Sequence, residues 1–272
     1  MNTTKRINRG GQTRKWQCYQ YCYIREDYET PVEEKLSFRQ IESEFLQNHK
    51  KWFTIKDDEY DLSKLQSKKR YEITKAHKFC RTEEINPFEK IEKLFEVYQE
   101  SFTAYPDRYR PKEILFEPFK EYISSLVKTG LHEFYATYYK TEEKMCGFLI
   151  IAHKENFITL KQQKTIHEYE KYNCNAALID FVLSKYNEKL KKKEVIFTNG
   201  SRSIKHETNF NAYLEKYFGF RKAYANLRIV YKFPFEIIVK ILRPFRKLFE
   251  HTRNSFLYNL YCVLKMDSYT SK

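Results

Sequence analysis

The side chains best suited to chemistry gather in one polar segment, residues 199–209, with the sequence NGSRSIKHETN. It follows the apolar run 194–198, so we expect it at the carboxyl end of a buried strand. His206 is a candidate general base, because an imidazole with its ordinary pKa of about 6.5 can take a proton at neutral pH. Glu207 could take the same proton or orient an amine substrate. The segment therefore predicts a catalytic site for proton transfer.

The same segment offers groups that could bind a ligand. Arg202 could contact a phosphate, and the polar side chains predicted to bind with it are Asn199, Ser201 and Asn209. The alternative is a connecting loop in which the Asn-Gly pair makes a turn and a later Thr or Asn caps the next helix. The residue types are compatible with both interpretations.

The cysteine spacing argues against a metal site. Of the six cysteines, Cys18 and Cys22 form a C-x3-C pair, but no second pair follows at zinc spacing. Free thiols in a reducing compartment are the expected state, and no metal is predicted.

Length and composition exclude several classes of protein. The chain has 272 residues, of which 42% are hydrophobic and 17% aromatic, which is enough apolar area to bury a core and argues against general disorder. No run of about 18 apolar residues predicts a transmembrane helix, and no apolar signal segment follows the basic N-terminus. A cytoplasmic protein is therefore expected. The formal net charge of +14 predicts an anionic partner, such as nucleic acid, anionic lipid or a phosphate-bearing ligand.

Residues 68–232 alternate between helical and strand-like periodicity. Helices are expected over 87–102, 116–129, 175–186 and 209–216, and strands over 71–79, 133–139, 145–152, 156–160, 194–198 and 224–231. A meander followed by strand–helix–strand crossovers predicts an α/β (α+β) fold with a central mixed, mostly antiparallel sheet flanked by helices.

This order of elements resembles the GNAT fold of acyl-CoA N-acyltransferases. The resemblance rests on a central hairpin, the helix and strand after it, and a distinctive segment before the last strand, which are 134–139 with 146–152, 176–186, 195–200 and LEKYFGFRKAY at 214–224. The last segment also resembles the Fem-type aminoacyltransferases, which share that fold. The stretch from 199–209 through 220–224 resembles a group of uncharacterised bacterial GNAT-like proteins. The resemblance implies a single GNAT-like domain over 68–232, an N-terminal extension over 1–67 and a helical segment over 233–272.

The resemblance also implies acetyl-CoA or another acyl-CoA as co-substrate. In GNAT enzymes a glycine-rich loop and the helix N-terminus after it hold the CoA pyrophosphate through their N–H groups. The matching segment here, 161–176, contains no glycine. Asn173 and Asn175 could adopt the turn, since asparagine tolerates left-handed backbone, and with Lys171 they are the predicted cofactor contacts. A tyrosine often reprotonates the leaving thiolate in this family, a role implied for Tyr224, with core packing as the alternative.

The two ends of the chain suggest contacts with anionic surfaces. Within 235–265 an apolar helical face is bordered by cations, and Pro244 is expected to divide the helix. A basic amphipathic helix can lie in an anionic membrane interface, which predicts peripheral association at the inner face of the membrane, with packing on the domain as the alternative. The basic arm of the first 15 residues could bind nucleic acid, but a disordered arm is the favoured interpretation.

The sequence thus favours an acyl-CoA-dependent N-acyltransferase that acts on an amine of a small molecule or of a sugar or cell-envelope precursor and transfers groups other than aminoacyl. The sugar-type acceptor comes from the resemblance alone. The amine would attack the thioester directly, with His206 or Glu207 removing its proton. Two alternatives stay open: a Fem-like transferase that uses aminoacyl-tRNA, and a non-catalytic protein of this fold that binds membrane or nucleic acid.

Overall fold

A computed structural model describes residues 17–18, 22–28, 51–105, 110, 114–202, 204, 209–252 and 254–269. The chain divides into two compact units. One, here called the central unit, comprises Ile55–Gly200 and Phe210–Arg221. The other, here called the terminal unit, falls within Met1–Thr54, Ser201–Asn209 and Lys222–Lys272. Strand β3 (Lys51–Lys56) contains the boundary between them.

The central unit is built on a mixed sheet in the order β8-β7-β6-β5-β4. These strands are β4 (Cys80–Glu84), β5 (His132–Tyr139), β6 (Lys144–Lys154), β7 (Phe157–Thr165) and β8 (Ile196–Ser201). β4 to β7 form an antiparallel meander, whereas β7 and β8 are parallel. Residues 145–151 of β6 are all buried, so this strand is covered on both faces of the sheet.

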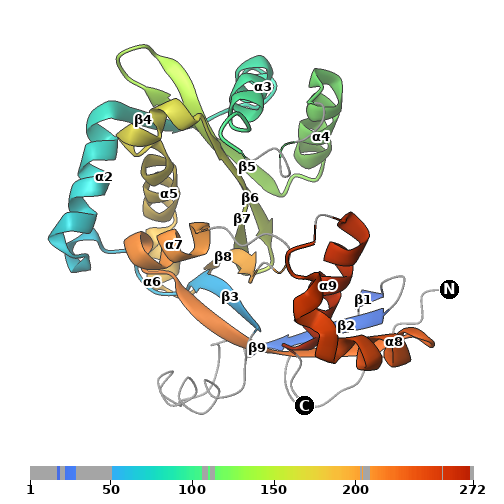
Figure 1. The fold of residues 1–272 in the computed structure, drawn as a ribbon. Helices are drawn as coiled ribbons and strands as arrows, with labels where there is room; N and C mark the ends of the chain where they lie inside the picture. The colour runs from blue at the N-terminus through green and yellow to red at the C-terminus, as the bar shows by residue number, and fades with distance from the viewer. Residues whose placement is uncertain are drawn as a thin grey trace. The chain divides into compact units, whose positions relative to one another are not determined.

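Helices supply both covers. They are η1 (Leu62–Lys64), α2 (Ser67–Phe79), α3 (Ile91–Glu100), α4 (Phe116–Lys128), η3 (His167–Tyr172), α5 (Cys174–Lys185), α6 (Asn187–Lys191) and α7 (Phe210–Phe218). α5 packs on β4, β5 and β6 and also contacts α2, while α3 packs on β6 and β7 and contacts α4. Figure 1 shows the two groups on opposite sides of the strands. α5 is apolar almost all round, with eight buried residues, because it lies between the sheet and α2.

The predicted fold class is confirmed: a mixed, mostly antiparallel sheet flanked by helices, with a parallel strand added after a helical crossover. The predicted helices 116–129 and 175–186 correspond to α4 and α5, and Gly130 ends α4 with a φ of +67°. A residue with positive φ directly after a helix is typically glycine, as predicted here.

The predicted strand 71–79 is wrong, because these residues form most of α2. Their alternation is weak, and the two buried side chains, Ile73 and Ala76, are three residues apart, as on one face of a helix. The strand follows instead at Cys80–Glu84, which has the polar sequence CRTEE. β4 is the last strand of the order, and an edge strand can carry polar residues that a central strand cannot.

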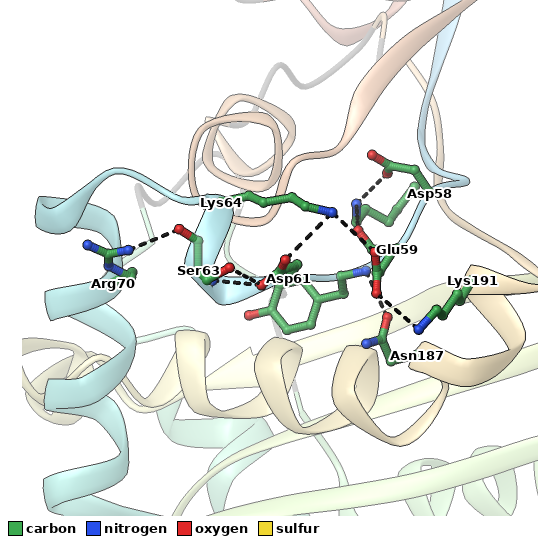
Figure 2. Close-up of polar contacts among 10 residues, drawn as sticks. Asp58, Glu59, Asp61, Ser63, Lys64, Arg70, Asn187 and Lys191 are labelled. Atoms are coloured by element: carbon green, nitrogen blue, oxygen red, sulfur yellow. Dashed lines mark hydrogen bonds and ion pairs between the residues drawn. The ribbon is translucent and has the colours of Figure 1, made fainter.

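The segment before α2 is fastened by polar contacts, which Figure 2 shows. Asp61 caps η1 by accepting from the Ser63 backbone N–H at 2.8 Å. The Lys191 ammonium of α6 lies 3.7 Å from the Glu59 carboxylate. Deeper in the unit, Tyr60 Oη donates to Asp180 Oδ1 at 2.6 Å, and His77 Nε2 lies 2.7 Å from Asp180 Oδ2. The buried Asp180 of α5 therefore joins this segment and α2 to one helix.

The terminal unit contains β1 (Gln17–Cys18), β2 (Cys22–Tyr28) and β9 (Arg221–Tyr231), whose antiparallel pairing runs in the order β1-β2-β9. Three helices follow, α8 (Phe235–Leu242), η4 (Arg243–Phe249) and α9 (Ser255–Asp267). Pro244 lies at the start of η4, where α8 ends, so the predicted division of the helix is confirmed. Among the helices described, none is both long and apolar enough to span a bilayer.

Candidate active site

The candidate site begins where two parallel strands of the central unit part. β7 and β8 pair over Phe157–Thr159 and Ile196–Thr198, and no further pair joins them among the described residues. β7 continues to Thr165 while paired with β6 on its other side. The second half of β7 therefore presents a backbone edge without a β8 partner, and an extended ligand that contains amide groups can pair with such an edge.

A β-bulge marks the point of separation. The β6 residues Ile150 and Ile151 pair with Gln162 and Leu160, so Lys161 is an extra residue on β7. A bulge bends its strand and increases the local twist. The bend thus falls just after the last residue of β7 that pairs with β8.

Lys164 extends from this half of β7 into a cluster of aromatic rings. Its Nζ lies 3.8 Å from the centroid of the Phe102 ring, 4.9 Å from that of Tyr105 and 5.7 Å from that of Tyr98. Burial lowers the pKa of Lys164 from 10.5 to about 8, because the ammonium loses hydration among the rings. Lys164 therefore has a neutral fraction near physiological pH and can accept a proton.

Arg110 holds the chain that carries two of these rings. Its guanidinium donates to the backbone carbonyls of Phe102 at 3.2 Å, Thr103 at 2.8 Å and Tyr105 at 3.0 Å. The carbonyls at the end of a helix have no partner within it, and here one side chain satisfies three carbonyls just after α3. The position of Tyr105, whose Oη lies 3.4 Å from Lys164 Nζ, is fixed by these bonds.

The opposite face of β7 meets the start of α5. Gln163 Nε2 donates to Asn175 Oδ1 at 2.7 Å, and Thr165 Oγ1 donates to the same oxygen at 3.2 Å. Residues 163 and 165 share a face because side chains alternate along a strand, and Lys164 between them points to the other face. Gln163 Oε1 is buried and has no hydrogen-bond partner among the described residues. It is an acceptor that a ligand N–H could satisfy.

At the turn into α5, one of the two asparagines predicted to supply left-handed backbone does so, and the other, Asn175, lies within the helix and is not among the described residues with positive φ. Asn173 has a φ of +59° and a ψ of +35°, the left-handed conformation that a glycine would otherwise provide. α5 has no acidic residue in its first turn, so its N-terminal dipole is available to an anion. The Asn173 side chain is already engaged, since Nδ2 donates to Glu72 Oε2 at 2.6 Å. The helix dipole at this end favours an anion, whereas the Glu72 carboxylate beside the turn acts against one.

The structure brings three predicted cofactor residues together at this turn. Asn173 and Asn175 lie as described, and Lys171 is exposed with its ammonium 5.1 Å from the Tyr172 ring centroid. Asn199 lies in β8, where its Nδ2 donates to Asn211 Oδ1 of α7 at 2.6 Å. No contact among the described residues joins Asn199 to the turn.

The remaining predicted residues are distributed differently. His206 and Glu207 lie outside the described residues. Arg202 and Tyr224 belong to the terminal unit, where both pack against Trp52, at 4.2 Å from the Arg202 guanidinium and 6.3 Å between ring centroids for Tyr224. The last two predicted binding residues are Ser201, which is half-buried, and Asn209, which is exposed.

Lys164 is the candidate that sequence reasoning missed. In the sequence it stands in the polar run KQQKT, where a lysine predicts an exposed side chain. The only signal was the aromatic spacing Tyr98, Phe102 and Tyr105 at the end of an amphipathic helix. Tyr98 and Phe102 continue the apolar face of that helix and Tyr105 lies in the break after it, and nothing in the sequence places the three rings opposite this lysine.

Comparison with known proteins gives similarity of fold. No family model and no curated protein matches the chain in sequence. The structure is similar to L-PGS from Bacillus licheniformis, with 13% identity, a TM-score of 0.46 and coverage of 75% of this chain and 68% of that one. FemX gives 10% identity, a TM-score of 0.46 and coverage of 64% and 61%. The PaiA N-acetyltransferase from Thermoplasma acidophilum, in complex with coenzyme A, gives 18% identity, a TM-score of 0.32 and coverage of 43% and 74%.

The topology of the central unit agrees with the predicted GNAT-like fold. An antiparallel meander of four strands leads through one long helix to a parallel strand, and a second helix follows before β9. The agreement is one of topology, and membership of the GNAT family stays a prediction from the sequence. No group of three or more His, Cys, Asp or Glu side chains within the described ranges could hold a metal ion.

Proposed function

We propose that the central unit is an acyltransferase that moves an acyl group from a CoA thioester to an amine. The observation that carries this proposal is Lys164, an amine with a pKa of about 8 beside the unpaired edge of β7. A general base works best with a pKa close to the working pH. An ordinary lysine, with a pKa near 10.5, would be almost fully protonated and could not serve.

The reaction follows from this one group. Neutral Lys164 Nζ takes a proton from the acceptor amine as the amine nitrogen attacks the thioester carbonyl. The C–N bond forms and the C–S bond breaks, and the thiolate leaves. Protonated Lys164 then returns the proton to the sulfur, whose ordinary thiol pKa of about 8.5 is close to its own. At the end of the reaction Lys164 is neutral again, the acceptor amine has become an amide, and the donor has become a free thiol.

The residues around the opening support the donor. A CoA thioester carries amide groups along its arm, and these suit the free backbone edge of β7 and the unpartnered acceptor Gln163 Oε1. Its pyrophosphate suits the start of α5, which follows a left-handed residue and has no acid in its first turn. The roles predicted for His206, Glu207 and Tyr224 from the sequence are not used in this reaction.

The first experiment is calorimetry of the full chain with acetyl-CoA, followed by thiol release with a panel of primary amines that includes amino sugars and polyamines. Saturable binding and amine-dependent thiol release support the proposal. Lys164→Met should bind acetyl-CoA as the wild type does but release thiol at least 100-fold more slowly, the usual scale of a lost general base. Lys185→Met is the matched control, because Lys185 is the last residue of α5 whereas the proposed site lies at the start of that helix. Absence of acetyl-CoA binding would overturn the CoA donor.

The net charge of +14 favours a second candidate, an aminoacyl ester carried on tRNA as the donor. The same amine panel with aminoacyl-tRNA in place of acetyl-CoA tests it. Transfer from aminoacyl-tRNA that Lys164→Met abolishes, without transfer from acetyl-CoA, would assign this donor and keep the proposed base.

A further inference from the structure

We infer that the terminal unit contains a binding pocket for the phosphate of an anionic phospholipid, next to an apolar stripe that enters the bilayer surface. The pocket has a volume of 380 Å³ and lies among η4, α9 and the residue that follows β8. Its charged lining is Arg202, Arg246, Lys247, Lys265 and Glu250. Four cations and one carboxylate line the same hollow, which attracts an anion.

One cation of the pocket, Arg202, is held in place by two aromatic rings and a backbone hydrogen bond. The guanidinium of Arg202 lies 4.2 Å from the Trp52 ring centroid and 4.8 Å from that of Tyr269. Its backbone N–H also donates to Trp52 O at 2.8 Å. An arginine stacked on aromatic rings keeps its planar N–H groups in a fixed direction, which suits phosphate oxygens.

The single carboxylate is engaged by a neighbour. Glu250 Oε1 accepts from Tyr261 Oη at 2.8 Å. Burial and then this bond raise the pKa of Tyr261, while Lys265 and Arg246 act in the opposite direction. Lys265 and Arg246 are therefore both close enough to Tyr261, another lining residue, to affect its hydroxyl group.

The apolar stripe runs past the pocket on α8 and η4. Its exposed side chains are Ile237, Ile238, Ile241, Phe245 and Leu248, with Leu248 74% and Ile241 61% exposed. Residues three apart share a face of a 3₁₀ helix, so Phe245 and Leu248 form one row of η4. Arg246 and Lys247 lie on the other two rows of η4 and line the pocket, together with Glu250, the residue that follows the helix.

The cations of the pocket differ from two other cations of residues 235–249, Lys240 and Arg243, in the carboxylates around them. Lys240 donates to Glu236 at 2.6 Å, and Arg243 lies 3.5 Å from Asp267. These two cations have carboxylate partners on their own segment or on α9. The four cations of the pocket instead line one hollow together, and the carboxylate in its lining, Glu250, accepts from Tyr261. An anionic bilayer is complementary to this surface. The apolar side chains are stabilised in the membrane interface, and a phosphate headgroup can enter the neighbouring pocket.

The test is vesicle sedimentation of the full chain with phosphatidylcholine alone and with phosphatidylcholine containing phosphatidylglycerol. We expect strong binding only to the anionic vesicles. The double variant Arg246→Gln/Lys265→Gln should bind them about 30-fold more weakly, as expected for two cations at a membrane surface. The control Lys240→Gln/Arg243→Gln removes the same charge from the same segment and should weaken binding less than about fivefold.

Two further arms keep the outcome decisive. Leu248→Ser should weaken binding while leaving the preference for anionic vesicles unchanged, and Lys247→Gln serves in place of the double variant if that protein does not fold. Equal losses in the pocket variant and the control would overturn the pocket. Saturation by inorganic phosphate or by a short RNA, lost in the pocket variant and without vesicle binding, would overturn the lipid and assign another anion. No acyl donor is present, so failure here leaves the proposed acyl transfer untouched.

Discussion

Lys164 and Lys185 are the same residue type in two regions of one unit, and the structure makes them opposites. Both lie over tyrosine rings, at 4.9 Å from Tyr105 for Lys164 and 5.0 Å from Tyr135 for Lys185. Burial acts on both ammonium groups to lower the pKa. It prevails at Lys164, whose pKa falls to about 8, whereas the pKa of Lys185 is raised.

Carboxylates make the difference. Lys185 Nζ donates to Glu84 Oε2 at 2.8 Å and to Glu133 Oε2 at 3.1 Å, and these bonds outweigh the loss of hydration. For Lys164 burial is the only cause of the shift. The first region thus holds a base suited to proton transfer, and the second holds a fixed charge suited to joining α5 to β5 and β4.

Glu133 is the centre of the second region. Tyr186 Oη donates to Glu133 Oε1 at 2.6 Å, His153 Nε2 lies 2.8 Å from the same oxygen, and Tyr135 also donates to this carboxylate. Burial alone would raise the pKa of Glu133, but the bonds from Tyr135, Tyr186 and Lys185 lower it to about 2. The network keeps this carboxylate charged at every physiological pH.

The largest expected effect is on activity. Lys164→Met should lower kcat/KM for acyl transfer by about 10²–10⁴-fold, because an amine with a pKa of about 8 is lost from the site. In the wild type kcat/KM should rise with pH and level off above about 8, as Lys164 loses its proton. A pH–rate profile of both proteins checks this. The same rising limb in Lys164→Met would remove Lys164 from the mechanism.

The next effect is on the stability of the carboxylate region. Glu133→Gln should lower the free energy of unfolding by roughly 2 kcal/mol at pH 7, because the Lys185 ammonium loses a partly buried partner. The folded pKa of Glu133 is below its ordinary 4.5, so its contribution is present above 4.5 and is lost as the pH falls towards 2. Urea unfolding at pH 7 and pH 3 measures the difference. Glu84→Gln, at a more exposed carboxylate on the same lysine, is the control and should cost less than about 0.5 kcal/mol.

The two lysines should respond to the same substitution with opposite signs. Lys164→Met should raise the free energy of unfolding by about 1 kcal/mol at pH 7, because a desolvated ammonium is replaced by an apolar group. Lys185→Met should lower it by about 1 kcal/mol, because it leaves Glu133 without its cation. The gain at Lys164 should be full below pH 8 and disappear as the pH rises to 10.5, the ordinary lysine value. Thermal unfolding of both variants at pH 7 and pH 10 measures these changes. If the free energy of unfolding changed in the same direction for both variants at pH 7, the comparison would be refuted.

The smallest effect extends the comparison to a histidine. The hydrogen bond to Asp180 raises the pKa of His77, while burial acts in the opposite direction, so a carboxylate again prevails. A raised pKa contributes stability below the ordinary value of 6.5 and loses it as the pH rises through the folded value. His77→Gln should therefore cost a few tenths of a kcal/mol at pH 6 and almost nothing at pH 9, since the side chain is largely exposed. His167→Gln, at an exposed histidine paired with Glu170, is the control in the same unfolding assay.

Local pattern determined much of the fold. The 3.6-residue period of α4, the strongly apolar sequence of α5, the strand-like sequence of β5 and the apolar run of β6 are properties of short segments, and each element was predicted from them. Asn173 in a left-handed turn and Pro244 at the end of α8 were also predicted, because backbone sterics act within a few residues. The strand assigned to residues 71–79 was wrong, because weak alternation in a polar segment does not distinguish a strand from a helix with only two buried residues.

The site depended on contacts between distant parts of the chain. Lys164 obtains its lowered pKa from rings about 60 residues earlier in the chain, at Phe102 and Tyr105, and Lys185 obtains its carboxylates from β4 and β5. The sequence by itself determined most of the helices and strands of the central unit, with the exception of residues 71–79, because periodicity and turn preference are local. Only the tertiary structure decided which lysine became a base and which became a fixed charge, because desolvation and ion pairing depend on the neighbours that folding brings together.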